Sequence, residues 1–174
     1  MQTVAVIGGG VAGTTFVKEL RKEWNEDLHI VLIEPKEYFE VPFAALRALA
    51  APGAFDRPIR VRLADWLNVD HRQSRVSELR SDAAVLENGE TVEFDYAVVA
   101  VGSTITGFDR LKVAEAQSIA ERDAEWRSEH ERLASAENVT IIGGGPIGVE
   151  IAGEILAAYP SKRLTLVHAT DRLL

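Results

Sequence analysis

The chain carries one glycine-rich pattern twice, and this repeat constrains its fold more than any other feature of the sequence. The stretch "VAVIGGGVAG" occupies residues 4–13, and "TIIGGGPIGVEIAG" occupies residues 140–153. Three glycines recur 135 residues apart, as the pairs Gly8 and Gly143, Gly10 and Gly145, and Gly13 and Gly148. In both copies an apolar run precedes the glycines and a helix-like pattern follows them. This order of strand, glycine loop, helix and strand predicts a duplicated nucleotide-binding unit.

The spacing of these glycines has a physical reason. The first allows a tight turn from strand to helix, the second lets the backbone approach a pyrophosphate, and the third lets the helix pack against the strand. The N-terminus of the helix adds unpaired N–H groups and a partial positive charge. A glycine turn that binds no ligand is the alternative at either loop. Two copies in the same context favour nucleotide binding.

The remaining segments predict an α/β fold, with a Rossmann-like three-layer arrangement, a small antiparallel β-meander and the start of a second Rossmann unit. Buried strands are expected at residues 3–7, 28–34 and 96–102, and further strands at residues 138–142 and 163–168. Helices are expected at residues 11–24, 41–50, 118–136 and 146–158. Antiparallel strands are expected at residues 74–80, 83–89 and 91–95, with a turn at Asn88-Gly89. Residues 54–71 are expected to form a loop with a helical turn near Asp65, and residues 103–117 a loop. The apolar face of the first helix comprises Phe16, Val17, Leu20 and Trp24.

Composition narrows the classes of partner and chemistry. Hydrophobic residues make up 47% of the chain, which is typical of a globular protein. The net charge is -8, which argues against nucleic acid or an anionic membrane as the main partner. Cysteine is absent, which excludes disulfides, thiolate metal sites and a dithiol redox shuttle. The four histidines lack the spacing of metal ligands, so no metal is expected. Because no apolar run approaches the roughly 20 residues of a membrane helix and the N-terminus does not resemble a signal peptide, we expect a cytoplasmic protein with at most peripheral membrane contact.

The residues after the two loops predict different ribose sites. Glu34 follows Gly13 by 21 residues, where a carboxylate can accept hydrogen bonds from both hydroxyls of an adenosine ribose. A solvated charge at a strand end is the alternative for Glu34. The corresponding residue of the second copy is His168, which does not repel a 2′-phosphate when neutral, and Arg172 could pair with one. The second site is therefore expected to accept NADH or NADPH, unless His168 only caps the end of its strand.

These stretches, together with "FDYAVVAVGS" at residues 94–103, resemble the FAD/NAD(P)-binding pyridine nucleotide oxidoreductases of the glutathione-reductase fold. The segment "EPKEYFEVPFAALRALA" at residues 34–50 and the histidine of "LTLVHA" are most similar to the apoptosis-inducing-factor-like and ferroptosis-suppressor-like quinone reductases. The resemblance covers essentially the whole chain. It implies the N-terminal part of an FAD-binding domain at residues 1–102, a connecting loop and helix at 103–137, and the first βαβ unit of an NAD(P)-binding domain at 138–174. Because members of the family are longer, the chain is expected to be an N-terminal half.

The resemblance also implies roles for single positions. Residues implied to contact FAD are Gly8, Gly10, Val11, Ala12, Gly13, Glu34, Pro35, Lys36, Val76, Ala100, Val101 and Gly102. Residues implied to bind NADH or NADPH are Gly143, Gly145, Pro146, Ile147, Gly148, Glu150 and His168, although Glu150 could instead only complement the positive helix end. Arg47 falls where relatives place a cation near the flavin, which would stabilise negative charge on the reduced ring. The alternative for Arg47 is a solvated residue on a short helix.

The function implied is that of an FAD-dependent NAD(P)H oxidoreductase that passes hydride through flavin to a quinone-like small acceptor. A homo-oligomer is compatible with this function. Two alternatives stay open. The first is a non-catalytic dinucleotide-binding module that pairs with another chain, and the second, less similar between the two loops, is a flavin monooxygenase.

Overall fold

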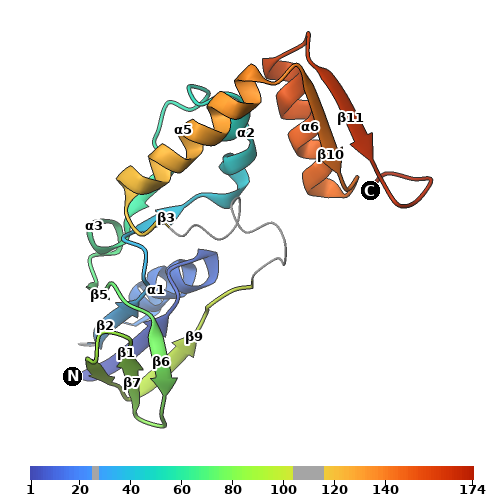
Figure 1. Ribbon diagram of the computed structural model, residues 1–174. Coiled ribbons are helices and arrows are strands. Elements are labelled where there is room, and N and C mark those ends of the chain that lie inside the picture. The colour runs from blue at the N-terminus through green and yellow to red at the C-terminus, as the bar shows by residue number, and fades with distance from the viewer. Residues whose placement is uncertain (25–27, 104–115) are drawn as a thin grey trace. The chain divides into compact units, whose positions relative to one another are not determined.

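The computed structural model describes residues 1–24, 28–103 and 116–174 (Figure 1). The chain divides into two compact units, each of which contains one glycine loop. Unit 1 comprises Met1–Glu40 and Arg60–Arg122, and unit 2 comprises Val41–Ile59 and Asp123–Leu174. The domain boundaries expected near residues 102 and 137 separate segments by the cofactor that each would bind, not by packing. These boundaries stay a prediction.

Unit 1 is built on a parallel sheet. Its strands are β1 (Gln2–Ile7), β2 (Leu28–Ile33), β5 (Asp70–Arg72) and β9 (Tyr96–Val99), in the order β5-β2-β1-β9. β1 and β2 pair from Gln2 opposite Leu28 to Ile7 opposite Ile33. Helix α1 (Val11–Glu23) joins these two strands. The βαβ unit expected around the first glycine loop is therefore present.

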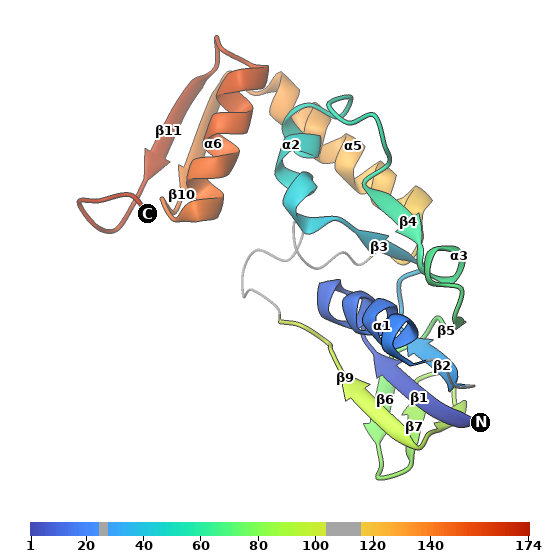
Figure 2. The ribbon, with the colours of Figure 1, turned by 180° about the vertical axis from the view of Figure 1, so that it is seen from behind.

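Apolar side chains cover both faces of this sheet. On one face they pack with α1 and with α3 (Leu63–Leu67), in a buried cluster of Val4, Val6, Val17, Ile30, Leu32, Leu63 and Leu67. On the other face the buried cluster comprises Ile7, Val31, Ile33, Ala84, Leu86 and Val92. This second cover comes from a meander of β6 (Val76–Leu79), β7 (Ala83–Leu86) and β8 (Thr91–Glu93). Figure 2 shows α1 and the meander on opposite sides of β1, so the expected three-layer α/β fold class is confirmed.

Two antiparallel pairings complete unit 1. The turn between β7 and β8 contains Gly89 at φ 86°, and the Leu86 N–H donates to the Glu90 carbonyl at 2.8 Å. The hairpin predicted from Asn88-Gly89 is therefore confirmed. β3 (Tyr38–Glu40) pairs antiparallel with β4 (Arg60–Arg62), a pairing that the sequence patterns do not reveal.

Three local predictions are wrong. Residues 70 and 71, expected at the end of a loop, lie in β5, which pairs with β2, because a short edge strand is held by backbone pairing and needs no apolar pattern. The segment 96–102 is not a buried strand, since β9 ends at Val99 and both Tyr96 and Val99 are 58% exposed. Among the described residues β9 pairs only with β1, so it forms an edge of the sheet. Trp24 is exposed because it ends α1 instead of continuing its apolar face.

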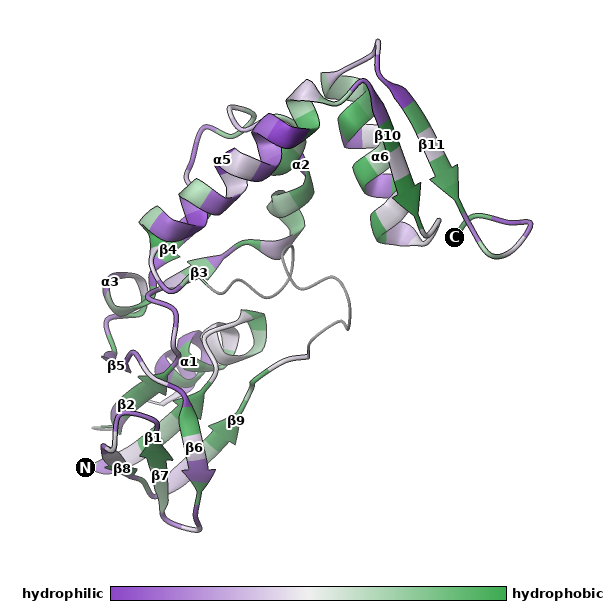
Figure 3. Cartoon of the chain, in the orientation of Figure 1, coloured by the Kyte–Doolittle hydropathy of each residue, from purple (hydrophilic) through white to green (hydrophobic). Residues whose placement is uncertain are grey.

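Unit 2 contains the second glycine loop. β10 (Asn138–Ile142) and β11 (Arg163–Val167) pair in parallel, and α6 (Pro146–Ala158) joins them, as expected. A 3₁₀ turn, η1 (Pro42–Ala44), leads into α2 (Ala45–Ala50), which packs against α6. The buried apolar side chains of unit 2 are Ala45, Leu46, Ala50, Trp126, Ala152 and Ile155. Figure 3 shows β10 and much of α6 as hydrophobic, whereas most of α5 (Ile119–Ser135) is hydrophilic.

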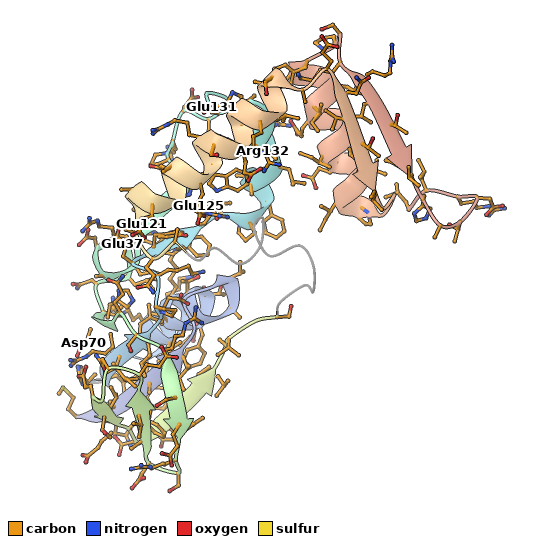
Figure 4. All side chains as sticks on the ribbon, in the orientation of Figure 1. Glu37, Asp70, Glu121, Glu125, Glu131 and Arg132 are labelled. Carbon is orange, nitrogen blue, oxygen red and sulfur yellow. The ribbon has the colours of Figure 1, made fainter. Side chains whose placement is uncertain are left out.

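The first turn of α5 lies in unit 1 and carries a capping box. The Ser118 hydroxyl accepts the Glu121 N–H at 3.2 Å, and the Glu121 carboxylate accepts the Ser118 N–H at 3.0 Å. The Ile119 N–H donates to Glu37 at 2.8 Å, and Figure 4 shows Glu37 and Glu121 at this end of the helix. The hydrogen bonds from Ser118, with a further one from Gln117, lower the pKa of Glu121. These hydrogen bonds cap the N-terminus of α5, which begins at Ile119, one residue after the predicted start.

Candidate dinucleotide sites

The first glycine loop is shaped by contacts that leave no space for side chains at Gly8 and Gly13. Gly8 adopts φ 109°, which favours glycine, and its N–H donates to the Ile33 carbonyl at 2.9 Å. A Cβ on Gly8 would overlap the Ala100 carbonyl, and a Cβ on Gly13 would overlap the Gly8 carbonyl. A Cβ on Gly10, by contrast, would meet nothing within 4 Å. The loop is therefore tightly packed on its inner side and open at Gly10, the cap residue of α1.

Glu34 lies beside this loop and is fixed by it. Its side chain is nearly buried, and the Gly9 N–H donates to Oε2 at 2.8 Å. The Lys36 N–H donates to Oε1 at 3.1 Å, and the Lys36 ammonium lies 3.8 Å from the same oxygen. Each carboxylate oxygen has capacity for a further hydrogen bond. Glu34 can therefore accept two hydroxyls of a ribose at the open N-terminus of α1.

The other residues expected around FAD lie in neighbouring segments of unit 1. The Ala100 N–H donates to the Ile7 carbonyl at 2.8 Å, so residue 100 follows β9 directly against the first loop. Val101 is exposed, Gly102 adopts φ 72°, and Val76 begins β6. Pro35 follows Glu34, and Val11 and Ala12 are exposed at the start of α1. The structure thus brings Glu34 and Ala100 to the first loop, while the cofactor contacts of all these residues stay predictions.

Sequence reasoning misses His71 at this site. Its Nε2 lies 2.9 Å from the Glu34 carbonyl, and the Glu34 N–H donates to the Arg72 carbonyl at 3.1 Å. These contacts hold the backbone of Glu34 at the end of β2. The polar "DHR" segment offers no pattern from which this role could be found, because the contacts depend on the pairing of β5 with β2.

The second glycine loop repeats the geometry of the first. Gly143 adopts φ 108°, and its N–H donates to the Val167 carbonyl at 2.8 Å. A Cβ on Gly148 would overlap the Gly143 carbonyl, whereas one on Gly145 would meet nothing within 4 Å. Pro146 occupies the first position of α6, and Ile147 is exposed beside it. The overlap at the third glycine and the open cap residue thus recur in the second copy, whereas a Cβ on Gly143, unlike one on Gly8, would meet nothing within 4 Å.

His168 occupies the place that Glu34 has in the first copy. The Gly144 N–H donates to His168 Nδ1 at 3.0 Å, as the Gly9 N–H donates to Glu34. The imidazole is only partly exposed. The expected correspondence of Glu34 and His168 is therefore reproduced in the hydrogen bonds of the two loops.

Arg47 pairs with Glu154 in unit 2. Arg47, on α2, donates to Glu154 of α6 through Nε at 3.0 Å and Nη2 at 2.8 Å. The hydrogen bonds and charge of Glu154 raise the pKa of Arg47, and the charge of Glu150 adds to this effect. The flavin-side role of Arg47 and the ribose role of Glu150 stay predictions. Glu154, which the sequence analysis overlooks, follows Glu150 by one helical turn, and that spacing alone marks it as a neighbour.

In residues 1–24, 28–103 and 116–174, no three histidine or acidic side chains are grouped so as to hold a metal ion. Within the same ranges, no helix has both the length and the apolar character needed to cross a membrane.

The chain matches known proteins over nearly its whole length. The family model described as pyridine nucleotide-disulphide oxidoreductase matches residues 2–174. Ferroptosis suppressor protein 1 of Xenopus laevis is 30% identical over 168 residues, which cover 95% of this chain and 43% of the relative. Apoptosis-inducing factor homolog A of Dictyostelium discoideum is 28% identical over 177 residues, which cover 98% of this chain and 42% of the relative. The chain therefore spans less than half the length of these curated relatives.

Solved structures show the same fold. The sulfide:quinone oxidoreductase of Aquifex aeolicus superposes with a TM-score of 0.61 at 25% identity, over 82% of this chain and 34% of that chain. The water-forming NADH oxidase of Lactobacillus brevis, bound to NADH, superposes with a TM-score of 0.72 at 21% identity, over 99% of this chain and 41% of that chain.

Proposed function

Since the chain belongs to the pyridine nucleotide-disulphide oxidoreductase family, we propose that it binds FAD at the first glycine loop and NADH or NADPH at the second. FAD and NAD(P)H are the cofactors of this family of oxidoreductases. We further propose that the protein takes part in electron transfer to a quinone-like small acceptor. The quinone named for the structural relative from Aquifex aeolicus supports this choice of acceptor.

The observation that carries the proposal is the position of Glu34. The Gly9 N–H holds its carboxylate beside a loop whose inner side admits no Cβ at Gly8 or Gly13. An adenosine ribose would meet two acceptor oxygens there, and a pyrophosphate would meet the positive end of α1. The residues of the first loop therefore fit the diphosphate end of FAD.

The chemistry itself would come from the cofactors, because hydride passes between nicotinamide and flavin when both are bound. The residues of this chain would bind and orient those groups. Glu34 would hold one ribose, the N-termini of α1 and α6 would hold the pyrophosphates, and His168 would contact the second ribose. Hydride transfer needs no protein acid or base, so the absence of a catalytic triad from the sequence is no objection.

The test is flavin binding by the purified chain. We expect FAD to bind, NADPH to bleach the visible flavin band, and a soluble quinone analogue to restore it faster than oxygen does. Glu34→Gln should weaken FAD binding by about tenfold, because two charge-assisted hydrogen bonds to the ribose are lost. Glu19→Gln, an exposed change on α1, is the matched control. Unchanged FAD affinity in Glu34→Gln would contradict the proposed ribose site.

A second candidate function is a non-catalytic dinucleotide-binding module that pairs with another chain. It is favoured by the exposed apolar side chains Ile142 and Val167 on β10 and β11. If this candidate is correct, NADPH will not bleach bound flavin, and the chain will associate in a concentration-dependent manner.

We also propose that the protein is cytoplasmic and that it assembles into homo-oligomers. Cell fractionation tests the location, and analytical ultracentrifugation tests the assembly.

A further inference from the structure

We propose that Asn88 is a site of spontaneous covalent modification, at which the backbone nitrogen of Gly89 displaces the side-chain amide of Asn88 and leaves an isoaspartate in the β7–β8 turn. The product loosens the meander that covers the parallel sheet of unit 1. The reaction consumes only water and requires no bound cofactor. It is therefore independent of the function proposed above.

The chemistry starts from a thermolabile side chain next to a backbone amide. The nitrogen of Gly89 loses its proton and bonds to Cγ of Asn88, the bond from Cγ to Nδ2 breaks, and the amide leaves as ammonia with a proton. Water then opens the cyclic imide at one of its two carbonyl carbons. Opening at Cγ leaves aspartate, whereas opening at the backbone carbonyl leaves isoaspartate, in which the main chain runs through Cβ and Cγ. No electrons are gained or lost.

The turn exposes both reacting groups. Asn88 and Gly89 are exposed, and a Cβ on Gly89 would meet nothing within 4 Å. Glycine carries no side chain that could block the approach of Cγ to its nitrogen. Among the described residues, the Gly89 N–H has one hydrogen bond, to the Leu86 carbonyl at 3.0 Å. A single bond at the tip of an exposed hairpin can open without unfolding the unit, which frees the nitrogen to react.

A second hydrogen bond activates the side chain that is attacked. Oδ1 of Asn88 accepts the Glu90 N–H at 3.0 Å, as in an Asx-turn. Oδ1 becomes negatively charged when the nitrogen adds to Cγ, and a backbone N–H that is already aimed at it stabilises this charge. In the part of the chain that the structure describes, no hydrogen bond holds Nδ2 of Asn88, so the leaving amide is not restrained.

The other asparagines of the described ranges lack these features. Asn68 and Asn138 are each followed by valine, whose branched Cβ crowds the attacking nitrogen. Asn138 also lies in β10, whose backbone pairs with β11. Asn88 should therefore react first, and the other two asparagines serve as internal controls.

An isoaspartate at position 88 changes the spacing of the hairpin. It adds one carbon atom to the main chain between β7 and β8. The hydrogen bonds from Gly89 to Leu86 and from Leu86 to Glu90 depend on the original spacing. Leu86 and Val92, on either side of the turn, are buried in the cluster that covers Ile7. Loss of the turn geometry should therefore loosen the cover of the sheet.

Tryptic peptides of the purified 174-residue chain, taken during incubation at mildly alkaline pH, test the proposal. The peptide 81–110 contains Asn88 and no other side-chain amide, so the mass gained when –NH₂ is replaced by –OH identifies the site. This gain should appear at least about tenfold faster than in the peptides that contain Asn68 and Asn138. A protein isoaspartate methyltransferase with labelled S-adenosylmethionine should then label the incubated chain, which separates isoaspartate from aspartate.

Asn88→Ser is the matched control variant. Its hydroxyl can accept the Glu90 N–H but forms no cyclic imide, so the incubated variant should incorporate no label. Hydrogen exchange reads the structural consequence. Amides of β7 and β8 should exchange at least about tenfold faster in incubated than in fresh wild-type chain, and incubation should not change them in Asn88→Ser.

Three results would overturn the proposal. One is no mass gain at Asn88, or a gain no faster than at Asn68 and Asn138. Another is a reaction more than about tenfold slower in the folded chain than in guanidinium chloride, which would show that the turn protects Asn88. The third is labelled protein with unchanged exchange in β7 and β8, which would show that the product leaves the hairpin intact.

Discussion

The two glycine loops share one local geometry but lie in sheets that are covered differently. The equivalent glycines Gly8 and Gly143 adopt φ 109° and 108°. Ile7 and Ile142 precede them at equivalent positions, yet Ile7 is 7% exposed and Ile142 is 78% exposed. In unit 1 the meander of β6, β7 and β8 covers Ile7, whereas in the described part of unit 2 the corresponding face of β10 and β11 is exposed.

This difference shows that the conformation of a glycine loop and the stability of the sheet that carries it have different causes. The conformation of the loop depends on a few glycines and on one strand-to-strand pairing, all of which lie within about thirty residues. The stability of the sheet depends on apolar area removed from water, which distant segments supply. Two copies of one motif can therefore have the same shape and different stability.

The largest effect is expected from the glycines of the packed inner side. Gly13→Ala should lower the free energy of unfolding of unit 1 by about 3 kcal/mol, because its Cβ overlaps the Gly8 carbonyl in a well-packed region. Gly148→Ala should have a smaller effect on unit 2, whose helix α6 can shift with less loss of packing. Hydrogen exchange read from peptides of each unit measures both changes.

The control variants for this pair are Gly10→Ala and Gly145→Ala, whose Cβ atoms would meet nothing within 4 Å. Each should change the free energy of unfolding by less than about 1 kcal/mol. A loss in Gly10→Ala as large as that in Gly13→Ala would show that the overlap at Gly13 is not the cause.

The next effect compares the equivalent isoleucines. Ile7→Ala should cost about 2–3 kcal/mol of stability, because it leaves a cavity between the parallel sheet and the meander. Ile142→Ala should cost less than about 1 kcal/mol, because its side chain is already exposed. Chemical denaturation of each variant measures the difference. Equal losses would mean that Ile142 is covered in solution, which would support assembly through this face.

A smaller effect is expected in the unmodified protein. Amides of β1 and β2 should exchange about a hundredfold more slowly than those of β10 and β11, since buried strands open only with their whole unit. Hydrogen exchange with mass spectrometry measures this on the wild-type chain. Equal protection of the two sheets would contradict the comparison.

The smallest effect concerns the start of α5. The hydrogen bonds from Ser118 and Gln117 lower the pKa of Glu121 below the ordinary value of a glutamate. A carboxylate with a lowered pKa contributes stability above its unfolded-state pKa, and this contribution is lost as the pH falls through the folded-state value. The Glu121→Gln variant should therefore lose less helicity than the wild-type chain when the pH falls below about 4.5. Circular dichroism as a function of pH measures it, with Glu131→Gln on the same helix as the control.

Much of the fold could be predicted because its signals are local. The glycines of both loops, the apolar strands beside them, the Asn88-Gly89 hairpin and the start of α5 each depend on residues close together in the sequence. β5, β3 and β4 could not be predicted, because polar segments such as "DHR" become strands only through a distant partner. The exposure of β9 was equally hidden, since an apolar strand has the same pattern at the centre and at the edge of a sheet.

The candidate sites divide in the same way. Sequence spacing alone identified both loops and paired Glu34 with His168, because a βαβ unit places the end of its second strand beside its own glycine loop. Only the tertiary structure assigned Nδ1 of His168 to the Gly144 N–H, His71 to the backbone of Glu34, and Arg47 to Glu154. Hydrogen bonds need atoms about 3 Å apart in a defined direction. A motif fixes which residues come near one another, but the packing of whole elements decides which atoms meet.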